Sequence, residues 1–203
     1  MIPKNYIHII KLAIPIILAN ASVPLLGLAD TAAIGQTGTA SALGAIALAT
    51  LIFNFVYWGF GFLRMGTTGF VSQALGAGDL DEMHALLFRA LLLGGAIGLG
   101  LIVLQPLIGE GAIYLLQSSE EIKSLVREYF YVRIWGAPAT LTTFAIFGTF
   151  IGAGLTRHLL IVQLFLNGLN VALNITFVVG FDYGVKGIAV GTVIAEWPTL
   201  FFA

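Results

Sequence analysis

The sequence has 203 residues, of which 59% are hydrophobic and 9% are charged, and its formal net charge is −1. Soluble domains have about a quarter of their residues charged, so this composition predicts an integral membrane protein. No basic tract is present to bind nucleic acid, and the absence of cysteine excludes disulfides and thiolate metal sites.

Apolar runs of about 20 residues cross the hydrocarbon as helices. We therefore predict an all-α fold of six transmembrane helices in one domain, 1–203, with spans at 12–34, 42–75, 85–107, 129–150, 159–179 and 185–203. The second run is too long for one perpendicular crossing, so we expect it to tilt or to project into water. The chain stops while still apolar, and we interpret it as half of a longer polypeptide whose C-terminal lobe is absent.

The polar stretch from Gly109 to Glu128 separates the third span from the fourth. We predict a loop followed by an interfacial helix start, capped by Ser118 or Ser119. The basic residues favour a cytoplasmic N-terminus by the positive-inside rule. On that orientation Lys4, Lys11, Arg89 and Arg157 lie inside, and Lys123, Arg127 and Lys186 lie outside.

The first span carries an acid, Asp30, with no basic residue between Lys11 and Arg64. A charge deep in hydrocarbon costs about 2.5–3.5 kcal/mol on insertion scales, so such an acid is protonated, faces a polar cavity or is functional. The alternative is an acid that rests at the outer interface without a partner. Pro15 and Pro24 interrupt the same helix and predict bends. An ionisable acid on a bendable helix indicates a switch driven by protonation.

The fifth span carries an amide face, because Gln163, Asn167, Asn170 and Asn174 recur at spacings of four, three and four. An amide without a partner in lipid costs several kcal/mol, so this face must look at another helix or a wet cavity. For Gln163 we favour a bridge between helices. For Asn170 and Asn174 we favour a cavity.

Glu196 in the sixth span has three open interpretations: an ion ligand, a partner of Arg64 or Arg133, or an acid near the inner interface. For Arg64 we expect a structural ion pair or a contact with lipid headgroups. We group Glu196 and Arg64 with Gln163 and Asn167 as a possible secondary polar site. The stretches GFGFLRMGTTG, GGAIGLG and FGTFIGAG predict small-residue faces that let helices approach closely.

Signatures of soluble enzymes are missing: the sequence has no Walker A motif, no GxSxG, no HExxH and no dinucleotide fingerprint. His8, His84 and His158 are too dispersed for an obvious metal site. We expect no enzymatic activity, no cofactor and no resident metal.

Several stretches resemble, in order and spacing, the multidrug and toxic compound extrusion (MATE) transporters. They are LAIPIIL and LADT in the first span, GTTGFVSQALGAGD after the second, and the run from YVRIWGAPAT through GAGLTR to GTVIA. GFLRMGTTG is similar to the DinF-like branch. The resemblance covers essentially the whole chain. Because that family has twelve spans in two six-helix lobes around an alternately opening cavity, it implies that this chain is the N-terminal lobe.

In that family, protons or sodium ions bind polar residues of this lobe and drive export of cationic or amphipathic compounds. The resemblance places ion coupling at Asp30, Asn170, Asn174 and Thr192. Some members have a second acid where this chain has Asn174. With an amide there, Na⁺ finds less charge compensation, since hard cations prefer carboxylate oxygens. We therefore favour H⁺ over Na⁺, with protonation of Asp30 bending the helix near Pro15 or Pro24.

Two alternatives remain. A flippase-like protein for lipids or lipid-linked sugars would show a cationic cavity, for which Arg64 and Arg133 are available. A non-transporting scaffold would need no acid at Asp30. The expected partners are membrane lipids, small amphipathic or cationic substrates and the C-terminal lobe. The expected location is the plasma (inner) membrane.

Overall fold

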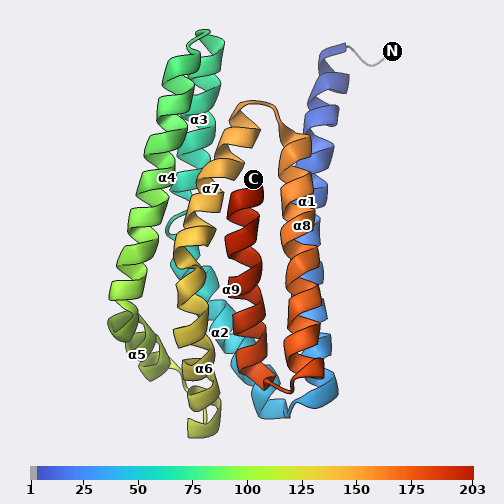
Figure 1. Cartoon of the computed structure of the whole chain (residues 1–203), viewed down its shortest axis with the longest axis vertical. Helices are drawn as coiled ribbons and strands as arrows, with labels where there is room; N and C mark the ends of the chain where they lie inside the picture. Colours follow the sequence, from blue (N-terminus) through green and yellow to red (C-terminus); the bar gives the residue numbers. More distant parts are fainter. Residues whose placement is uncertain (1–3) are drawn as a thin grey trace.

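A computed structural model of the chain describes residues 4–203, apart from the side chains of residues 4–6, 8 and 37. The expectations for Lys4 and His8 lie outside the described side chains. Over the described range the fold is helical without strands, and six segments are long and apolar enough to span a bilayer (Figure 1). The predicted all-α membrane fold is confirmed. The candidate spans are 9–36, 40–76, 80–103, 120–152, 156–180 and 184–202.

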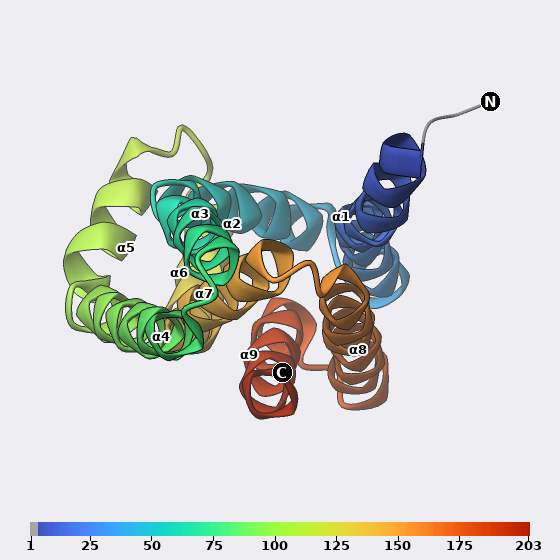
Figure 2. The same cartoon turned by 90° about the horizontal axis from the view of Figure 1, so that it is seen from above.

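The helices have the following bounds: α1 Lys4–Thr37, α2 Ala40–Trp58, α3 Phe62–Gly76, α4 Leu80–Val103, α5 Gln105–Leu115, α6 Glu120–Arg133, α7 Ala137–Gly152, α8 Thr156–Ile175 and α9 Gly184–Phe202. A 3₁₀ turn, η1 (Ile134–Gly136), joins α6 to α7, and a π-helical turn, η2 (Thr176–Gly180), continues α8. Seen from above, α7 lies between the α3–α4 pair and the α8–α1 pair (Figure 2).

The second span, predicted over 42–75, corresponds to the candidate span 40–76 and contains two helices. The chain turns at Gly59–Gly61, so that α2 ends at Trp58 and α3 begins at Phe62. Glycine is a poor helix former, and two glycines around one residue weaken the helix there. The excess length is therefore taken up by a break within the span.

The stretch expected to be a loop after the third span is mostly helical, because α5 occupies Gln105–Leu115. Pro106 begins this helix, at a position where its missing amide hydrogen costs nothing. Ser119 caps α6 by accepting from the amide of Ile122, as predicted. Arg127 on α6 donates to both carboxylate oxygens of Glu110 on α5, at 2.9 and 2.7 Å. These hydrogen bonds hold the pKa of Glu110 below its ordinary value.

Two of the three glycine-rich stretches form close helix contacts. A Cβ added to Gly98 on α4 would overlap the Cα of Pro138, and one on Gly94 would lie 2.9 Å from the carbonyl oxygen of Leu141, both on α7. The glycines of α7 face α3 in the same way, with Gly148 against the backbone of Arg64. Small residues let helix backbones approach in lipid, where no hydrophobic force drives helices together.

The remaining glycine-rich stretch, GFGFLRMGTTG, contacts α7 through hydroxyl groups rather than through its glycines. The hydroxyl of Thr68 lies 3.1 Å from the carbonyl oxygen of Gly148, and that of Ser72, just beyond the stretch, lies 3.1 Å from the carbonyl oxygen of Gly152. Each hydroxyl also lies 2.8 Å from a carbonyl oxygen one turn earlier in α3, so it shares its hydrogen between the two helices. A Cβ on Gly66 or on the neighbouring Gly69 would meet nothing within 4 Å. The small-residue prediction for these two glycines is therefore wrong.

Replacing Gly98 by alanine is expected to destabilise the chain by about 1–3 kcal/mol, because the new methyl group would overlap backbone atoms of α7 that cannot rotate away. Gly100→Ala is the matched control, since a Cβ at Gly100 meets nothing within 4 Å in the same helix. Thermal unfolding of both variants in detergent measures the difference. Equal stability of the two variants would contradict the close approach of α4 and α7.

Candidate functional site

The structure brings together three of the four residues predicted to couple ions. The side-chain amide nitrogen of Asn174 on α8 donates to Oδ1 of Asp30 on α1 at 2.7 Å, and to Oδ1 of Asn170 at 2.5 Å. Asn170 and Asn174 are fully buried, and Asp30 is half-buried. A carboxylate can only accept hydrogen bonds, so the amide nitrogen is the group that must face Asp30. Asp30 therefore has a partner on another helix.

The carbonyl oxygen of Asn174 is a buried acceptor without a hydrogen-bond donor among the described residues. It lies against Gly191 of α9, where an added Cβ would overlap it. Gly191 thus leaves the space that the amide fills. Unpaired buried acceptors are rare in proteins, and they gather at sites of function.

Thr192, the fourth predicted residue, is the neighbour of Gly191 and is also buried. Its hydroxyl donates to the carbonyl of Ile188 at 2.8 Å, one turn earlier in α9. No hydrogen bond from Thr192 to Asp30 or the two amides is found in the described part of the chain. The residue therefore borders the cluster without joining its hydrogen bonds.

The other half of the amide face bridges α8 to α1. Gln163 donates to Asn167 at 2.9 Å, and Asn167 donates to the hydroxyl of Ser22 at 2.7 Å. The bridge between helices is therefore made by Asn167, and Gln163 contacts it within α8. Four amides in one row thus produce two separate contacts with α1, one structural contact at Ser22 and one at the carboxylate of Asp30.

The helix changes form directly after Asn174, since α8 ends at Ile175 and continues as the π-helical turn η2. Such turns widen the backbone and occur frequently at functional sites. The amide cluster therefore sits at the transition between two helical geometries.

The second polar centre is a buried ion pair between Arg133 at the end of α6 and Glu196 on α9. Arg133 donates two hydrogen bonds to the two carboxylate oxygens, at 2.9 and 2.6 Å, and Thr140 donates a third to Glu196 at 2.8 Å. Both ion-pair residues are less than 10% exposed. Of the three interpretations of Glu196, the structure supports the ion pair with Arg133.

Aromatic rings and a glycine enclose this pair. The guanidinium of Arg133 lies 5.4 Å from the ring centroid of Phe53 and 5.9 Å from that of Tyr57, within cation–π range. A Cβ on Gly136 would overlap Oε2 of Glu196, so glycine is needed where the carboxylate passes the backbone.

The remaining predicted residues lie apart from both centres. Arg64 on α3 is half-buried, and no ion pair to it is found within residues 4–203. Pro15 is buried and Pro24 exposed, and α1 is one unbroken helix across both. Sequence reasoning missed Ser22, Thr140, Gly136 and Gly191, because their roles depend on which helix faces them. The one local signal in the sequence was at Gly191, a glycine that directly precedes the predicted site residue Thr192.

Comparisons with known proteins cover most of the chain. A family model described as MatE matches residues 15–176. The DNA damage-inducible protein F of Escherichia coli (strain K12) is 35% identical over 189 residues, which cover 93% of this chain and 41% of that protein. The probable multidrug resistance protein NorM of Thermotoga maritima is 30% identical over 202 residues, or 97% of this chain and 43% of that protein. The chain spans less than half the length of these curated relatives.

Solved structures share the fold. A MOP superfamily transporter from Pyrococcus furiosus, described as having a binding pocket of reverse polarity, matches with a TM-score of 0.88 at 23% identity. A multidrug resistance MATE family transporter in an outward-facing conformation matches with the same TM-score and identity. Each match covers 96% of this chain and 43% of the other.

Removing one member of the buried ion pair is expected to destabilise the chain strongly. Arg133→Gln or Glu196→Gln should each lower the free energy of unfolding by about 3–5 kcal/mol, because the remaining charge is left buried without a partner. The Arg133→Met/Glu196→Met double variant should lose less than the sum of the two. Arg127→Gln, which breaks the exposed pair with Glu110, is the matched control and should have a small effect. Unfolding in detergent measures all four, and a Glu196→Gln variant as stable as Arg127→Gln would contradict the buried pair.

Proposed function

The chain belongs to the MatE family, as its motifs predicted, and we propose that it forms the N-terminal lobe of a transporter that exports amphipathic or cationic organic compounds in exchange for protons. The observation that carries the proposal is the hydrogen bond from Asn174 to Asp30, which ties an ionisable acid in one spanning helix to an amide in another. The names of the relatives support multidrug export as the activity of the whole protein.

Proton coupling follows from the chemistry of this hydrogen bond. Deprotonated Asp30 accepts from Asn174, whereas protonated Asp30 has a hydroxyl that must itself find an acceptor. The unpaired carbonyl oxygen of Asn174 and the side-chain oxygen of Asn170 are the acceptors at hand. Protonated Asp30 keeps one oxygen that can accept from Asn174, and its new hydroxyl must donate to one of these acceptors, so protonation adds a donor and changes the hydrogen bonds of the cluster. It also removes a charge that is costly in the hydrocarbon.

Sodium is disfavoured because Asp30 is the one carboxylate found in the amide cluster within the described residues. Hard cations take several oxygen ligands and are held most tightly by carboxylates. Glu196, the nearest candidate for a second acid, is fully engaged by Arg133 and Thr140. A proton needs a single carboxylate, and this is what the cluster offers.

Transport requires that the two protonation states favour different shapes of the lobe, since a ligand shifts an equilibrium only by its differential affinity for the two states. We propose that α1 is the moving element. With Asp30 deprotonated, the hydrogen bond holds α1 against α8 and leaves the cavity open to substrate. With Asp30 protonated, the bond rearranges and α1 bends near Pro15 or Pro24, where the helical ladder lacks an amide hydrogen. The cavity shrinks and substrate leaves.

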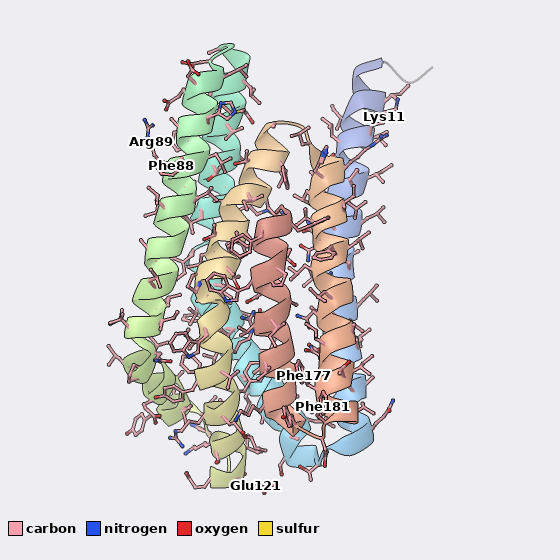
Figure 3. The ribbon with its side chains drawn as sticks, in the orientation of Figure 1. Lys11, Phe88, Arg89, Glu121, Phe177 and Phe181 are labelled. Carbon is pink, nitrogen blue, oxygen red and sulfur yellow. The ribbon has the colours of Figure 1, made fainter. Side chains whose placement is uncertain are left out.

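The basic residues support a cytoplasmic N-terminus in the plasma (inner) membrane. Lys11 and Arg89 lie toward the same end of the bundle, and Glu121 lies at the opposite end (Figure 3). By the positive-inside rule, the end with Lys11 faces the cytoplasm. The proposed transporter has no enzymatic step and needs no cofactor.

The flippase alternative depends on free cationic side chains in the cavity. Arg133 does not meet this requirement, because Glu196 neutralises it through two hydrogen bonds. Arg64, the other arginine named for that cavity, forms no ion pair among residues 4–203. Substitution of Asp30 distinguishes the scaffold alternative from transport, because a non-transporting scaffold needs no acid at that position.

Asp30→Asn is expected to abolish proton-driven efflux in the transporter that unites this chain with its second lobe, because an amide cannot take up and release the proton. Efflux of a fluorescent organic cation from vesicles, driven by a proton gradient and separately by a sodium gradient, measures the effect. Asp79→Asn is the matched control, since Asp79 is an exposed helix cap and asparagine caps equally well. Unchanged proton-driven efflux in a correctly inserted Asp30→Asn protein would overturn the assignment.

Asn174→Asp is expected to create sodium binding, because it adds a second carboxylate 2.7 Å from the first at the position where Asn174 now donates. Sodium should then raise the melting temperature of the variant chain, with no effect of choline at equal ionic strength. The unmodified chain should show no sodium effect. A sodium-dependent rise in the unmodified chain would contradict proton selectivity.

A further inference from the structure

A groove of about 470 Å³ lies between α1 and α8, outside both polar centres. Its walls are apolar and include Ile14, Leu18, Leu160 and Ile161. Lys11 of α1 and Arg157 of α8 complete its lining. The groove therefore combines two cations with a hydrocarbon surface, which is the pattern of a site for an amphipathic anion.

The two cations are available to a ligand. Lys11 and Arg157 are exposed, and neither forms an ion pair within the part of the chain that the structure describes. No acidic residue lines the groove. Arg157 also lies in the first turn of α8, which begins without a side-chain cap. The positive end of that helix adds to the field of the two side chains.

The depth of the groove matches the boundary between headgroups and hydrocarbon. Lys11 stands near the start of the candidate span 9–36, and Arg157 near the start of the span 156–180. The apolar wall residues Ile14, Leu18 and Ile161 follow them toward the interior of the same spans. A ligand in the groove would have its charge at the interface and its apolar part in the membrane.

Pro15 adds a hydrogen-bond acceptor at this level. It lines the groove, and because proline has no amide hydrogen, the carbonyl of Lys11 lacks its donor in the helical ladder. A headgroup with a hydroxyl can supply that donor. The groove thus offers two cations for a phosphate and one carbonyl for a hydroxyl.

We propose that the groove between α1 and α8 binds one anionic phospholipid, with its phosphate between Lys11 and Arg157 and an acyl chain along Ile14, Leu18 and Ile161. Basic pockets between spanning helices are the sites where acidic headgroups bind. A glycerol headgroup carries hydroxyls that can donate to a carbonyl, so phosphatidylglycerol is the anionic lipid that we propose. The bound lipid holds the basic end of α1 to α8, whereas Asn174 holds α1 at Asp30.

Native mass spectrometry of the delipidated 203-residue chain tests the site, with dioleoylphosphatidylglycerol or dioleoylphosphatidylcholine added in detergent. The chain should bind phosphatidylglycerol more tightly than phosphatidylcholine. The Lys11→Gln/Arg157→Gln variant should lose about 30-fold in affinity for phosphatidylglycerol, given the contribution of a basic residue near an anionic headgroup. Lys123→Gln/Lys186→Gln removes the same charge elsewhere on the chain and should leave the affinity unchanged.

Two further arms separate a lipid site from a simple phosphate site and from a folding defect. Ile161→Trp fills the groove without changing charge and should also weaken phosphatidylglycerol binding, whereas sn-glycerol 3-phosphate should not compete. Lys11→Arg/Arg157→Lys keeps both charges and should bind like the unmodified chain. The proposal is overturned by equal binding of the two lipids, by full binding in the Lys11→Gln/Arg157→Gln variant, or by effective competition from the headgroup alone.

Discussion

Hydrocarbon offers no hydrogen-bond partner, so a polar group within the spans is stabilised by finding one in the protein, and this constraint favours particular helix neighbours. Arg133 and Glu196, 63 positions apart, satisfy one another and join α6 to α9. Asn174 and Asp30, 144 positions apart, join α8 to α1. An apolar face in lipid can turn to any neighbour at similar cost, whereas these polar groups can be satisfied in one arrangement only.

The lobe uses two kinds of helix contact, and they differ in stiffness. On one side, the backbones of α3, α4 and α7 approach closely through Gly94, Gly98 and Gly148, so that no side chain can rotate to accommodate a shift. On the other side, α1 meets α8 through the hydrogen bonds at Ser22 and Asp30, which can break and re-form. The movement of α1 that we propose would take place on this second side, against the close-packed frame of the first.

The sequence alone predicted the membrane class, the six spans and the amide face, because composition and periodicity are local properties. The break at Gly59–Gly61 was missed because the apolar run continues through it. Asp30 and Asn174 were each singled out, yet their mutual hydrogen bond depends on the packing of two distant helices. For Glu196 the partner was one of three possibilities, since sequence spacing does not tell which arginine reaches it.

In both polar centres an oxygen atom occupies the place where a neighbouring residue would have its Cβ: Glu196 beside Gly136, and Asn174 beside Gly191. Gly136 is thus required by the Arg133–Glu196 pair, and Gly191 by the amide of Asn174. During evolution the members of each pair must change together. A lineage that replaces both Glu196 and Arg133 with smaller residues frees Gly136 to acquire a side chain, and the two glycines should drift independently of each other.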